Sequence, residues 1–168
     1  MSVTVIVGGS RGDEGKGRYV DELMHEHDIG ARFNGGGNAG HTVVYDDHVY
    51  KLHGLPTSIV HPGKKSVIGN GSVINPITLG NEIVTLTEQG VEINDCNLLI
   101  SSAAHLTLPS YIYDDVIRES GDGAQGSTKS GIAQTYSHKA LRDGMQAHKI
   151  NNDPRALFEK TLDSLREQ

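Results

Sequence analysis

A glycine-rich stretch near the N-terminus, Gly8–Arg18, constrains the fold more than any other part of the chain. It follows a β-branched run, Val3–Val7, which predicts a buried strand, and it precedes apolar residues at helical spacing over 19–24. A strand, a glycine-rich turn and a helix form a phosphate cradle, because backbone amides, the helix N-terminus and the Lys16 ammonium all favour anions. The stretch therefore predicts a phosphate-binding loop after the first strand of an α/β fold.

Two carboxylates distinguish this loop from the common nucleotide loop, Gly-x-x-x-x-Gly-Lys-Ser/Thr. Ser10 stands in place of the first glycine, and Gly17 in place of the hydroxyl residue that would hold magnesium. Asp13 and Glu14 stand where phosphate oxygens should approach. They would repel phosphate unless a divalent cation lies between, or unless one of them acts as a base. A glycine-rich turn with solvated acids is the alternative.

The rest of the chain alternates between predicted strands and predicted helices. The expected strands are 31–33, 66–68 and 98–100, with a short extended piece at 106–108. The expected helices are 15–27, 76–89, one opening at 109, a partly helical stretch over 133–147 and one opening at 153. Asp46-Asp47 predicts a small β-hairpin between 42–45 and 48–52, and 69–71 predicts a further turn. This pattern predicts a single α/β domain over 1–168, with a mostly parallel sheet and flanking helices.

Two further loops are candidates for ligand contact. Asn34–His41 is rich in glycine and asparagine, so its backbone can take positive φ repeatedly and face a ligand. The polar loop 119–131 holds almost no apolar residue, which fits a flexible linker or a second anion loop built from Gly126–Ser130. Composition leaves both interpretations of the second loop open.

Composition narrows the classes of partner and compartment. The net charge of −6 argues against nonspecific binding to nucleic acid. The single cysteine excludes an intramolecular disulfide and fits a reducing compartment. The chain has no run of 18 apolar residues and no basic segment before its short apolar start. We therefore expect a cytoplasmic protein without nucleic-acid or membrane partners, and the histidine spacing predicts no zinc site.

Four motifs, in order and spacing, resemble the adenylosuccinate synthetase family. They are Gly12-Asp13-Glu14-Gly15-Lys16-Gly17, Asn38-Ala39-Gly40-His41-Thr42, Ile68-Gly69-Asn70-Gly71, and Gly126-Ser127-Thr128 followed by Arg142. The likeness covers nearly all of the chain but only the N-terminal part of the family's chain. It implies a GTP-dependent ligase that forms a C–N bond. IMP, L-aspartate and GTP would become adenylosuccinate, GDP and phosphate in the synthesis of AMP.

The resemblance implies catalytic roles for two residues. Asp13 would take the N1 proton of IMP and bind Mg²⁺, and His41 would act as the acid. The carbonyl of Gly40 would complete the metal shell. The co-substrate GTP would be held by residues Gly12, Asp13, Glu14, Gly15, Lys16, Gly17, Arg18, Gly40, His41 and Thr42.

The same resemblance implies an IMP site made from several segments. It would use Asp13, Glu14, Gly15, Lys16, Asn38, Ala39, Gly40, His41, Thr128 and Arg142. Thr128 and Arg142 would hold the 5′-phosphate, and in the family that arginine serves the other subunit's site. The resemblance therefore implies a homodimer.

Departures from the family pattern keep alternatives open. Ser10-Arg11 replaces the usual Gln-Trp, and Thr128–Gly131 departs from Thr-Gly-Arg-Gly, as in divergent archaeal or phage members. One phage branch makes a 2-aminoadenine precursor from dGMP and usually carries serine at the base position, so the retained Asp13 favours IMP. The family's guanine-reading and aspartate-binding elements lie beyond Gln168. The alternatives are therefore a fragment, a domain that needs a partner chain, an inactive nucleotide-binding protein, and a generic triphosphate hydrolase.

Overall fold

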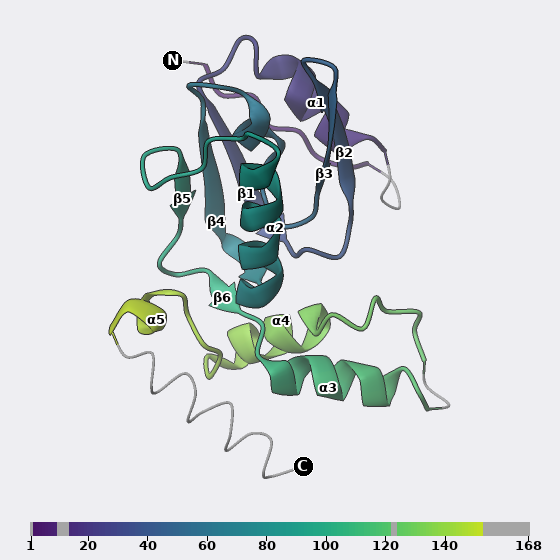
Figure 1. Ribbon diagram of the computed structural model, residues 1–168. Helices are drawn as coiled ribbons and strands as arrows, with labels where there is room; N and C mark the ends of the chain where they lie inside the picture. The colour runs from purple at the N-terminus through teal and green to yellow at the C-terminus, as the bar shows by residue number, and fades with distance from the viewer. Residues whose placement is uncertain (1, 10–13, 122–123, 153–168) are drawn as a thin grey trace.

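A parallel sheet centred on β4 (Lys65–Ile74) organises the fold (Figure 1). The computed structural model describes residues 2–9, 14–121 and 124–152. In it β4 pairs in parallel with β1 (Ile29–Gly35) on one side and β5 (Leu98–Ile100) on the other. The short β6 (His105–Leu106) also pairs in parallel with the end of β4. The predicted parallel sheet of an α/β fold is confirmed.

β4 is longer than the sequence indicates, because it continues through the three residues that predict a turn. Its pairing with β1 shifts register between Arg32 and Asn34, which marks a bulge. A Cβ atom added to Gly71 would overlap the carbonyl oxygen of Phe33 on β1. Glycine at this position therefore permits a close approach of two strands, and the prediction of a turn at 69–71 is wrong.

In the part of the chain that the structure describes, five helices and one 3₁₀ turn accompany the sheets. They are α1 (Lys16–Leu23), η1 (Thr57–Val60), α2 (Pro76–Glu88), α3 (Pro109–Arg118), α4 (Ile132–Leu141) and α5 (His148–Asn152). Figure 1 shows α2 along one face of the sheet, with α3 and α4 together beyond β6. The Asn75 side chain caps α2 by accepting the amides of Ile77 and Thr78.

The helix predictions hold best where the start signal is local. α2 and α3 begin at the prolines that predict them, whereas α1 ends earlier than expected, at Leu23. The stretch 133–147 is partly helical as predicted, because α4 covers it up to Leu141, and the short α5 begins just after it at His148. The helix predicted from Asp153 lies outside the described residues. None of the described helices is long and apolar enough to cross a membrane.

The predicted hairpin forms a separate antiparallel sheet of β2 (His41–Tyr45) and β3 (His48–Leu52). Asp46 and Asp47 between them have φ angles of 48° and 61°. Two positive φ angles in succession are the geometry of a tight hairpin turn, which aspartate tolerates better than most residues. The hairpin prediction is confirmed.

The N-terminal run Val3–Val7, predicted as a buried strand, forms none. Its side chains Val3, Val5 and Val7 are 85%, 65% and 71% exposed. β1 is an edge strand, and in the described part of the chain no strand pairs with its outer side. Strand-forming residues need a hydrogen-bonded neighbour and a face to bury. Val3–Val7 has high strand propensity, but among the described residues it has neither a hydrogen-bonded neighbouring strand nor a buried face. The prediction of a buried strand here is therefore wrong.

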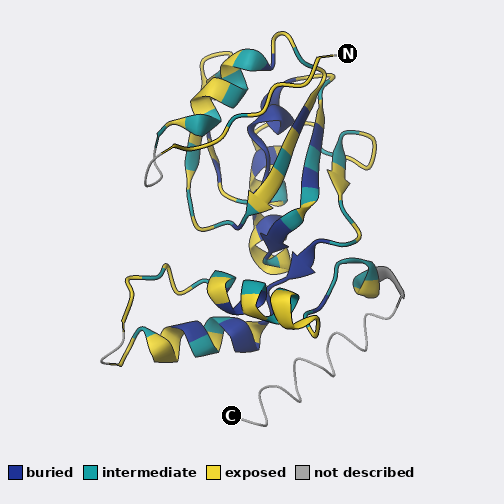
Figure 2. Ribbon diagram, turned by 180° about the vertical axis from the view of Figure 1, so that it is seen from behind, coloured by how far each residue is buried: buried dark blue, intermediate teal, exposed yellow. Residues whose placement is uncertain are grey.

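The core lies between the sheet, α2 and the base of the hairpin. Its most buried apolar side chains come from five separate segments: Leu52, Leu55, Ile68, Leu86 and Leu106. Figure 2 shows the burial concentrated along the inner strands and η1, with yellow exposed residues on the outer faces of the helices. The hairpin base and the carboxyl end of β4 are therefore fixed by the same core.

Candidate functional site

The start of α1 carries the described part of the predicted phosphate loop. Gly15 precedes the helix with a φ of 74°, in the left-handed region. The ammonium of Lys16 pairs with the Glu14 carboxylate, and their side chains are 39% and 25% exposed. The predicted cation of the loop is thus already next to an anion. Gly12 and Asp13 lie outside the described residues.

His41, the first residue of β2, lies against this loop. A Cβ atom added to Gly17 would be 3.2 Å from His41 Nδ1 and 3.4 Å from His41 Cβ. A side chain at position 17 would therefore crowd the imidazole, and glycine lets the ring approach the start of α1. The structure brings together two of the sequence motifs, the one with Lys16 and the one with His41.

The surroundings of His41 keep its ring neutral. Burial lowers the pKa of His41, the nearby Arg32, His53 and Lys16 lower it further, and Glu82 acts in the opposite direction. A neutral imidazole donates a hydrogen bond from one ring nitrogen and accepts at the other. His41 can therefore act as a hydrogen-bond donor beside the Lys16 ammonium.

Glu82 of α2 is a buried carboxylate that binds the backbone where the hairpin ends. It is 8% exposed. Its Oε1 accepts the amides of His53 at 2.8 Å and Leu55 at 3.3 Å, and its Oε2 accepts the amide of Gly54 at 2.8 Å. Three consecutive amides satisfy the charge, so the carboxylate fixes the exit of β3.

Arg32 of β1 binds carbonyls on both sides of the hairpin. Its guanidinium donates to the carbonyls of His53 and Gly54 after β3 and to those of Gly36 and Asn34 before β2. It therefore connects the loop that leads into His41 with the backbone that follows β3. Sequence reasoning singled out neither Arg32 nor Glu82, because nothing local marks their contacts with His53 and Gly54, which lie 21 to 29 residues away.

A cavity of about 120 Å³ lies between the loop Asn34–His41, the start of α2 and the loop before α4. Its wall is mostly apolar, with the Arg32 guanidinium and several hydroxyls. The lining residues are Arg32, Gly35, Gly36, Gly37, Gly54, Ile68, Ser72, Val73, Ile74, Asn75, Thr78, Leu79, Thr107, Ser130 and Ile132. The cavity touches both further loops that the sequence predicts as ligand contacts, 34–41 and 119–131. Four of the predicted site residues are not part of its wall: Asn38, His41, Thr128 and Arg142.

The described part of the second loop, 124–131, is held by hydrogen bonds. The carboxylates of Asp115 on α3 and of Glu119, the cap that follows α3, accept donors from it. The hydroxyls of Thr128 and Ser130 are hydrogen-bonded to each other. These hydrogen bonds favour an ordered loop over a flexible linker for these residues.

Tyr136 and Lys139 attach α4 to the sheet. The Tyr136 hydroxyl accepts the amide of Gly35 and donates to the carbonyl of Gly71, both at 2.8 Å. Lys139 Nζ donates to the carbonyl of Asn70 at 2.6 Å. These contacts fix the helix that leads from the second loop to Arg142.

Arg142 ends α4 with a φ of 65° and is exposed. Asn38 and Thr128 are also exposed. Within the described ranges, no hydrogen bond or ion pair joins the side chain of Arg142 or Asn38 to another residue, and the Arg142 amide donates to the Lys139 carbonyl at 3.2 Å. The structure therefore groups Lys16 with His41, and leaves Asn38, Thr128 and Arg142 facing solvent.

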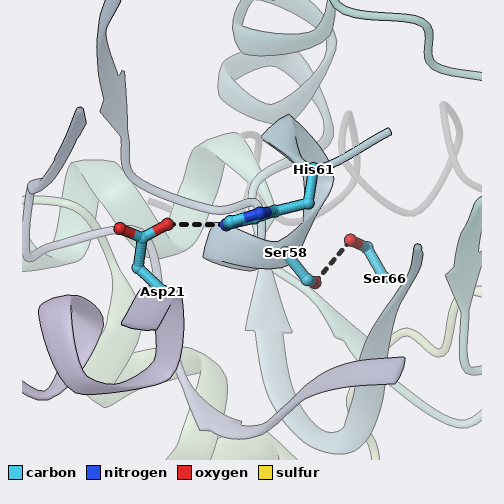
Figure 3. Close-up of polar contacts among 4 residues, drawn as sticks. All are labelled: Asp21, Ser58, His61 and Ser66. Atoms are coloured by element: carbon cyan, nitrogen blue, oxygen red, sulfur yellow. Dashed lines mark hydrogen bonds and ion pairs between the residues drawn. The ribbon is translucent and has the colours of Figure 1, made fainter. Parts of the chain in front are cut away.

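A buried histidine holds α1 in place (Figure 3). His61 Nε2 lies 2.7 Å from Asp21 Oδ1 of α1, and the His61 side chain is only 5% exposed. Nearby, the hydroxyls of Ser58 and Ser66 are 2.6 Å apart. The His61–Asp21 pair connects α1, which follows the phosphate loop, to the end of η1. Among the residues that the structure describes, no group of three or more His, Cys, Asp or Glu side chains could hold a metal ion.

Comparison with known proteins identifies what the chain is similar to. The family model of adenylosuccinate synthetase matches residues 5–168. The adenylosuccinate synthetase of Caldanaerobacter subterraneus subsp. tengcongensis is 46% identical over 154 residues, which is 90% of this chain and 36% of that protein. That of Oceanobacillus iheyensis is 41% identical over 170 residues, which is 100% of this chain and 39% of that protein.

Two solved structures resemble the fold. The fully ligated adenylosuccinate synthetase of Plasmodium falciparum matches with a TM-score of 0.81 and 36% identity, over 93% of this chain and 37% of that chain. A succinoaminodeoxyadenylate synthetase of cyanophage S-2L, bound to dGMP and dATP, matches with a TM-score of 0.64 and 26% identity, over 85% and 40%. The chain thus spans little more than a third of the length of these relatives.

Proposed function

The chain belongs to the adenylosuccinate synthetase family, and on that premise we propose that residues 1–168 act as one nucleotide-binding unit in adenylosuccinate synthesis. The reaction joins L-aspartate to IMP and converts GTP to GDP and phosphate. The observation that carries the proposal is the contact of His41 with the start of α1, beside Lys16. A neutral donor and a cation at one helix N-terminus suit a triphosphate.

In the proposed reaction Asp13 removes the N1 proton of IMP. The 6-oxygen then attacks the γ-phosphorus of GTP, and GDP leaves. The amine of aspartate attacks C6, loses a proton, and the phosphate on the 6-oxygen leaves. A carboxylate can accept this proton. When it is held beside the reacting nitrogen, the proton transfer takes place within the complex and needs no diffusion.

The remaining residues of the phosphate loop and the hairpin would hold GTP. Lys16 and the backbone from Gly12 to Arg18 bind the phosphates, and His41 donates to the oxygen on which charge develops. Residues 40–42 contribute further contacts to GTP. Asp13 and the carbonyl of Gly40 suit Mg²⁺, which prefers oxygen ligands and a few carboxylates next to phosphates. When bound, Mg²⁺ would neutralise phosphate charge.

IMP would lie between the two loops. Asn38 meets the base, Ala39 and Gly40 lie along it, and Thr128 holds the 5′-phosphate. Arg142 serves the site of a second copy, which makes the protein a homodimer. Its exposed position at the end of α4 supports that assignment. A pathway that uses free nucleotides places the protein in the cytoplasm, without nucleic-acid or membrane partners.

Calorimetric titration of the 168-residue chain with IMP, GTP and dGMP tests the proposal. We expect weak binding of IMP, and GTP bound through its phosphates. Gly17→Ala should weaken GTP binding by about tenfold or more, because the methyl group displaces His41. Gly80→Ala on α2, where an added Cβ meets nothing within 4 Å, is the matched control. Equal GTP affinity in both variants would contradict the role of the His41 contact.

A second experiment addresses the base. In a protein of the relatives' full length, Asp13→Asn should lower turnover at least about 10²-fold, the low end for positioned proton transfer. Turnover close to that of the unmodified protein would exclude Asp13 as the base. The isolated chain should form no adenylosuccinate, because positioning supplies much of the rate in phosphoryl transfer.

The second candidate function is the dGMP-dependent reaction. The observation that favours it is the structural likeness to the cyanophage protein bound to dGMP. Asp13 and the higher identity to the adenylosuccinate synthetases favour IMP. Tighter binding of dGMP than of IMP in the titration above would reverse this assignment.

A further inference from the structure

Asp115 is a buried carboxylate of α3 that faces the loop leading into α4. It is 5% exposed. It accepts the hydroxyl of Ser127 and the amide of Gly131, both at 2.9 Å, on different carboxylate oxygens. These hydrogen bonds lower the pKa of Asp115 against the effect of burial, which raises it. The carboxylate therefore joins two residues that flank Thr128.

Glu119, the C-terminal cap of α3, repeats this arrangement four residues after Asp115. Its two oxygens accept the amide of Gln125 at 2.9 Å and the amide of Gly126 at 2.8 Å. Residues four apart on a helix lie on the same face. Asp115 and Glu119 therefore form one carboxylate pair beneath the described part of the loop, 124–131.

The pair changes what the loop can offer to an anion. The amides of Gln125, Gly126 and Gly131 donate to the carboxylates, and the amide of Lys129 donates to Ser127 Oγ at 3.1 Å. The hydroxyls of Thr128 and Ser130 are hydrogen-bonded to each other, Thr128 and Lys129 are exposed, and Ser130 is half-buried at the cavity. An anion would therefore meet side chains here rather than a nest of backbone amides.

We propose that Asp115 is a positioning residue which, together with Glu119, preforms the loop 124–131 as a hydroxyl-lined site for the phosphate of a nucleoside monophosphate. The identity of the phosphate rests on the proposed function, whereas the preformed loop rests on the hydrogen bonds alone. The hydroxyls of Thr128 and Ser130 are the direct contacts. Asp115 acts through Ser127 and Gly131 and does not touch the ligand.

The test measures loop order and ligand binding in the same variants. Asp115→Asn keeps one carbonyl oxygen but cannot accept from both partners. We expect amide hydrogen exchange over 124–131 to become about tenfold faster and IMP affinity to fall about tenfold, the effect of losing one hydrogen bond to a charged group. Glu88→Gln at the end of α2 removes an equal charge outside this loop and should change neither quantity.

Ser127 provides variants that leave the buried carboxylate in place, in case Asp115→Asn fails to fold. Ser127→Ala removes one donor to Asp115 and should weaken IMP binding, while Ser127→Thr keeps the hydroxyl and should retain it. A general loss of stability would not separate alanine from threonine in this way.

The outcomes separate the two proposals. Unchanged exchange in Asp115→Asn, or faster exchange with unchanged IMP affinity, would overturn the positioning role. A lack of IMP binding by the unmodified chain would contradict the proposed function instead, and the exchange rates would still decide whether Asp115 and Glu119 hold the loop.

Discussion

Arg32 and Glu82 hold the same two peptide groups from opposite ends. Arg32 donates to the carbonyls of His53 and Gly54, and Glu82 accepts the amides of Gly54 and Leu55, which complete the same two peptide groups. The carboxylate is buried and the guanidinium half-buried, and each lies at the favourable end of these peptide dipoles. Removing one charge would leave the other buried and uncompensated.

Glu82→Gln should therefore destabilise the fold. Losing a buried charged partner costs about 3 kcal/mol, more than a change on the surface. Urea unfolding at neutral pH measures the difference in the free energy of unfolding. Glu88→Gln on the same helix is exposed and should stay within about 0.5 kcal/mol of the unmodified chain. Equal stability of the two variants would show that the Arg32–Glu82 arrangement contributes nothing net.

Two glycines of the chain should respond to alanine in opposite directions. Gly71→Ala places a methyl group on the Phe33 carbonyl oxygen, so the β1–β4 pairing must shift, at a cost of about 2 kcal/mol or more. Gly80→Ala in α2 meets nothing within 4 Å and should stabilise by roughly 0.5–1 kcal/mol, because glycine is a poor helix former. Thermal unfolding of both variants checks the sign. Tolerance of Gly71→Ala would contradict the close approach at the bulge, and destabilisation by Gly80→Ala would contradict the open space around that position.

Local signals in the sequence predicted the elements that depend on neighbouring residues. The Asp46-Asp47 turn and the Asn75-Pro76 start of α2 are examples, since their chemistry is complete within a few residues. The run Val3–Val7 and the glycines 69–71 were misread, because both depend on whether another strand lies beside them. The sequence predicted that Lys16 and His41 lie close together only because both motifs belong to one site in the family that the chain resembles.

The polar anchors of the candidate site were the least predictable part. Arg32, Glu82 and Asp115 are single charged residues within ordinary strand and helix patterns, and such residues usually face solvent. Their burial is decided by backbone groups that are distant in sequence. The second loop illustrates the same limit, because its composition fits both a linker and an anion site, and it does not reveal the hydrogen bonds to Asp115 and Glu119 that hold the loop.

Stability should fall in mild acid because of His105. Burial lowers the pKa of His105, Lys139 and Lys149 lower it further, and a hydrogen bond to the backbone of Ala103 opposes them. Its Nδ1 is buried without a partner among the described residues. The unfolded chain therefore takes up a proton below about pH 6.5, before the folded chain does. This group's stabilising contribution is present above pH 6.5 and is lost as the pH falls towards its lower folded pKa.

Urea unfolding between pH 5 and pH 7.5 measures this dependence. His105→Gln should flatten the profile, by up to about 1.4 kcal/mol per pH unit for one proton. His48→Gln in the exposed hairpin turn should leave it unchanged. An identical acid slope in His105→Gln and the unmodified chain would rule out His105 as the source.

Arg142 should act on a ligand held by a second copy of the chain. It is exposed at the end of α4, and its side chain has no hydrogen bond or ion pair in the described part of its own chain, whereas Thr128 lies on the loop before α4. If each site uses Thr128 of one copy and Arg142 of the other, then Thr128→Val and Arg142→Leu homodimers should each bind IMP about tenfold more weakly, the loss of one charge-assisted contact. A hybrid dimer of the two variants contains one site with both residues intact. Mixing the chains should therefore restore about one strong site per dimer, measured by titration calorimetry after the hybrid is isolated through two different affinity tags. The double variant mixed with itself is the control and should show no recovery. Hybrids that form but bind as weakly as the parent variants would exclude a site shared across the dimer.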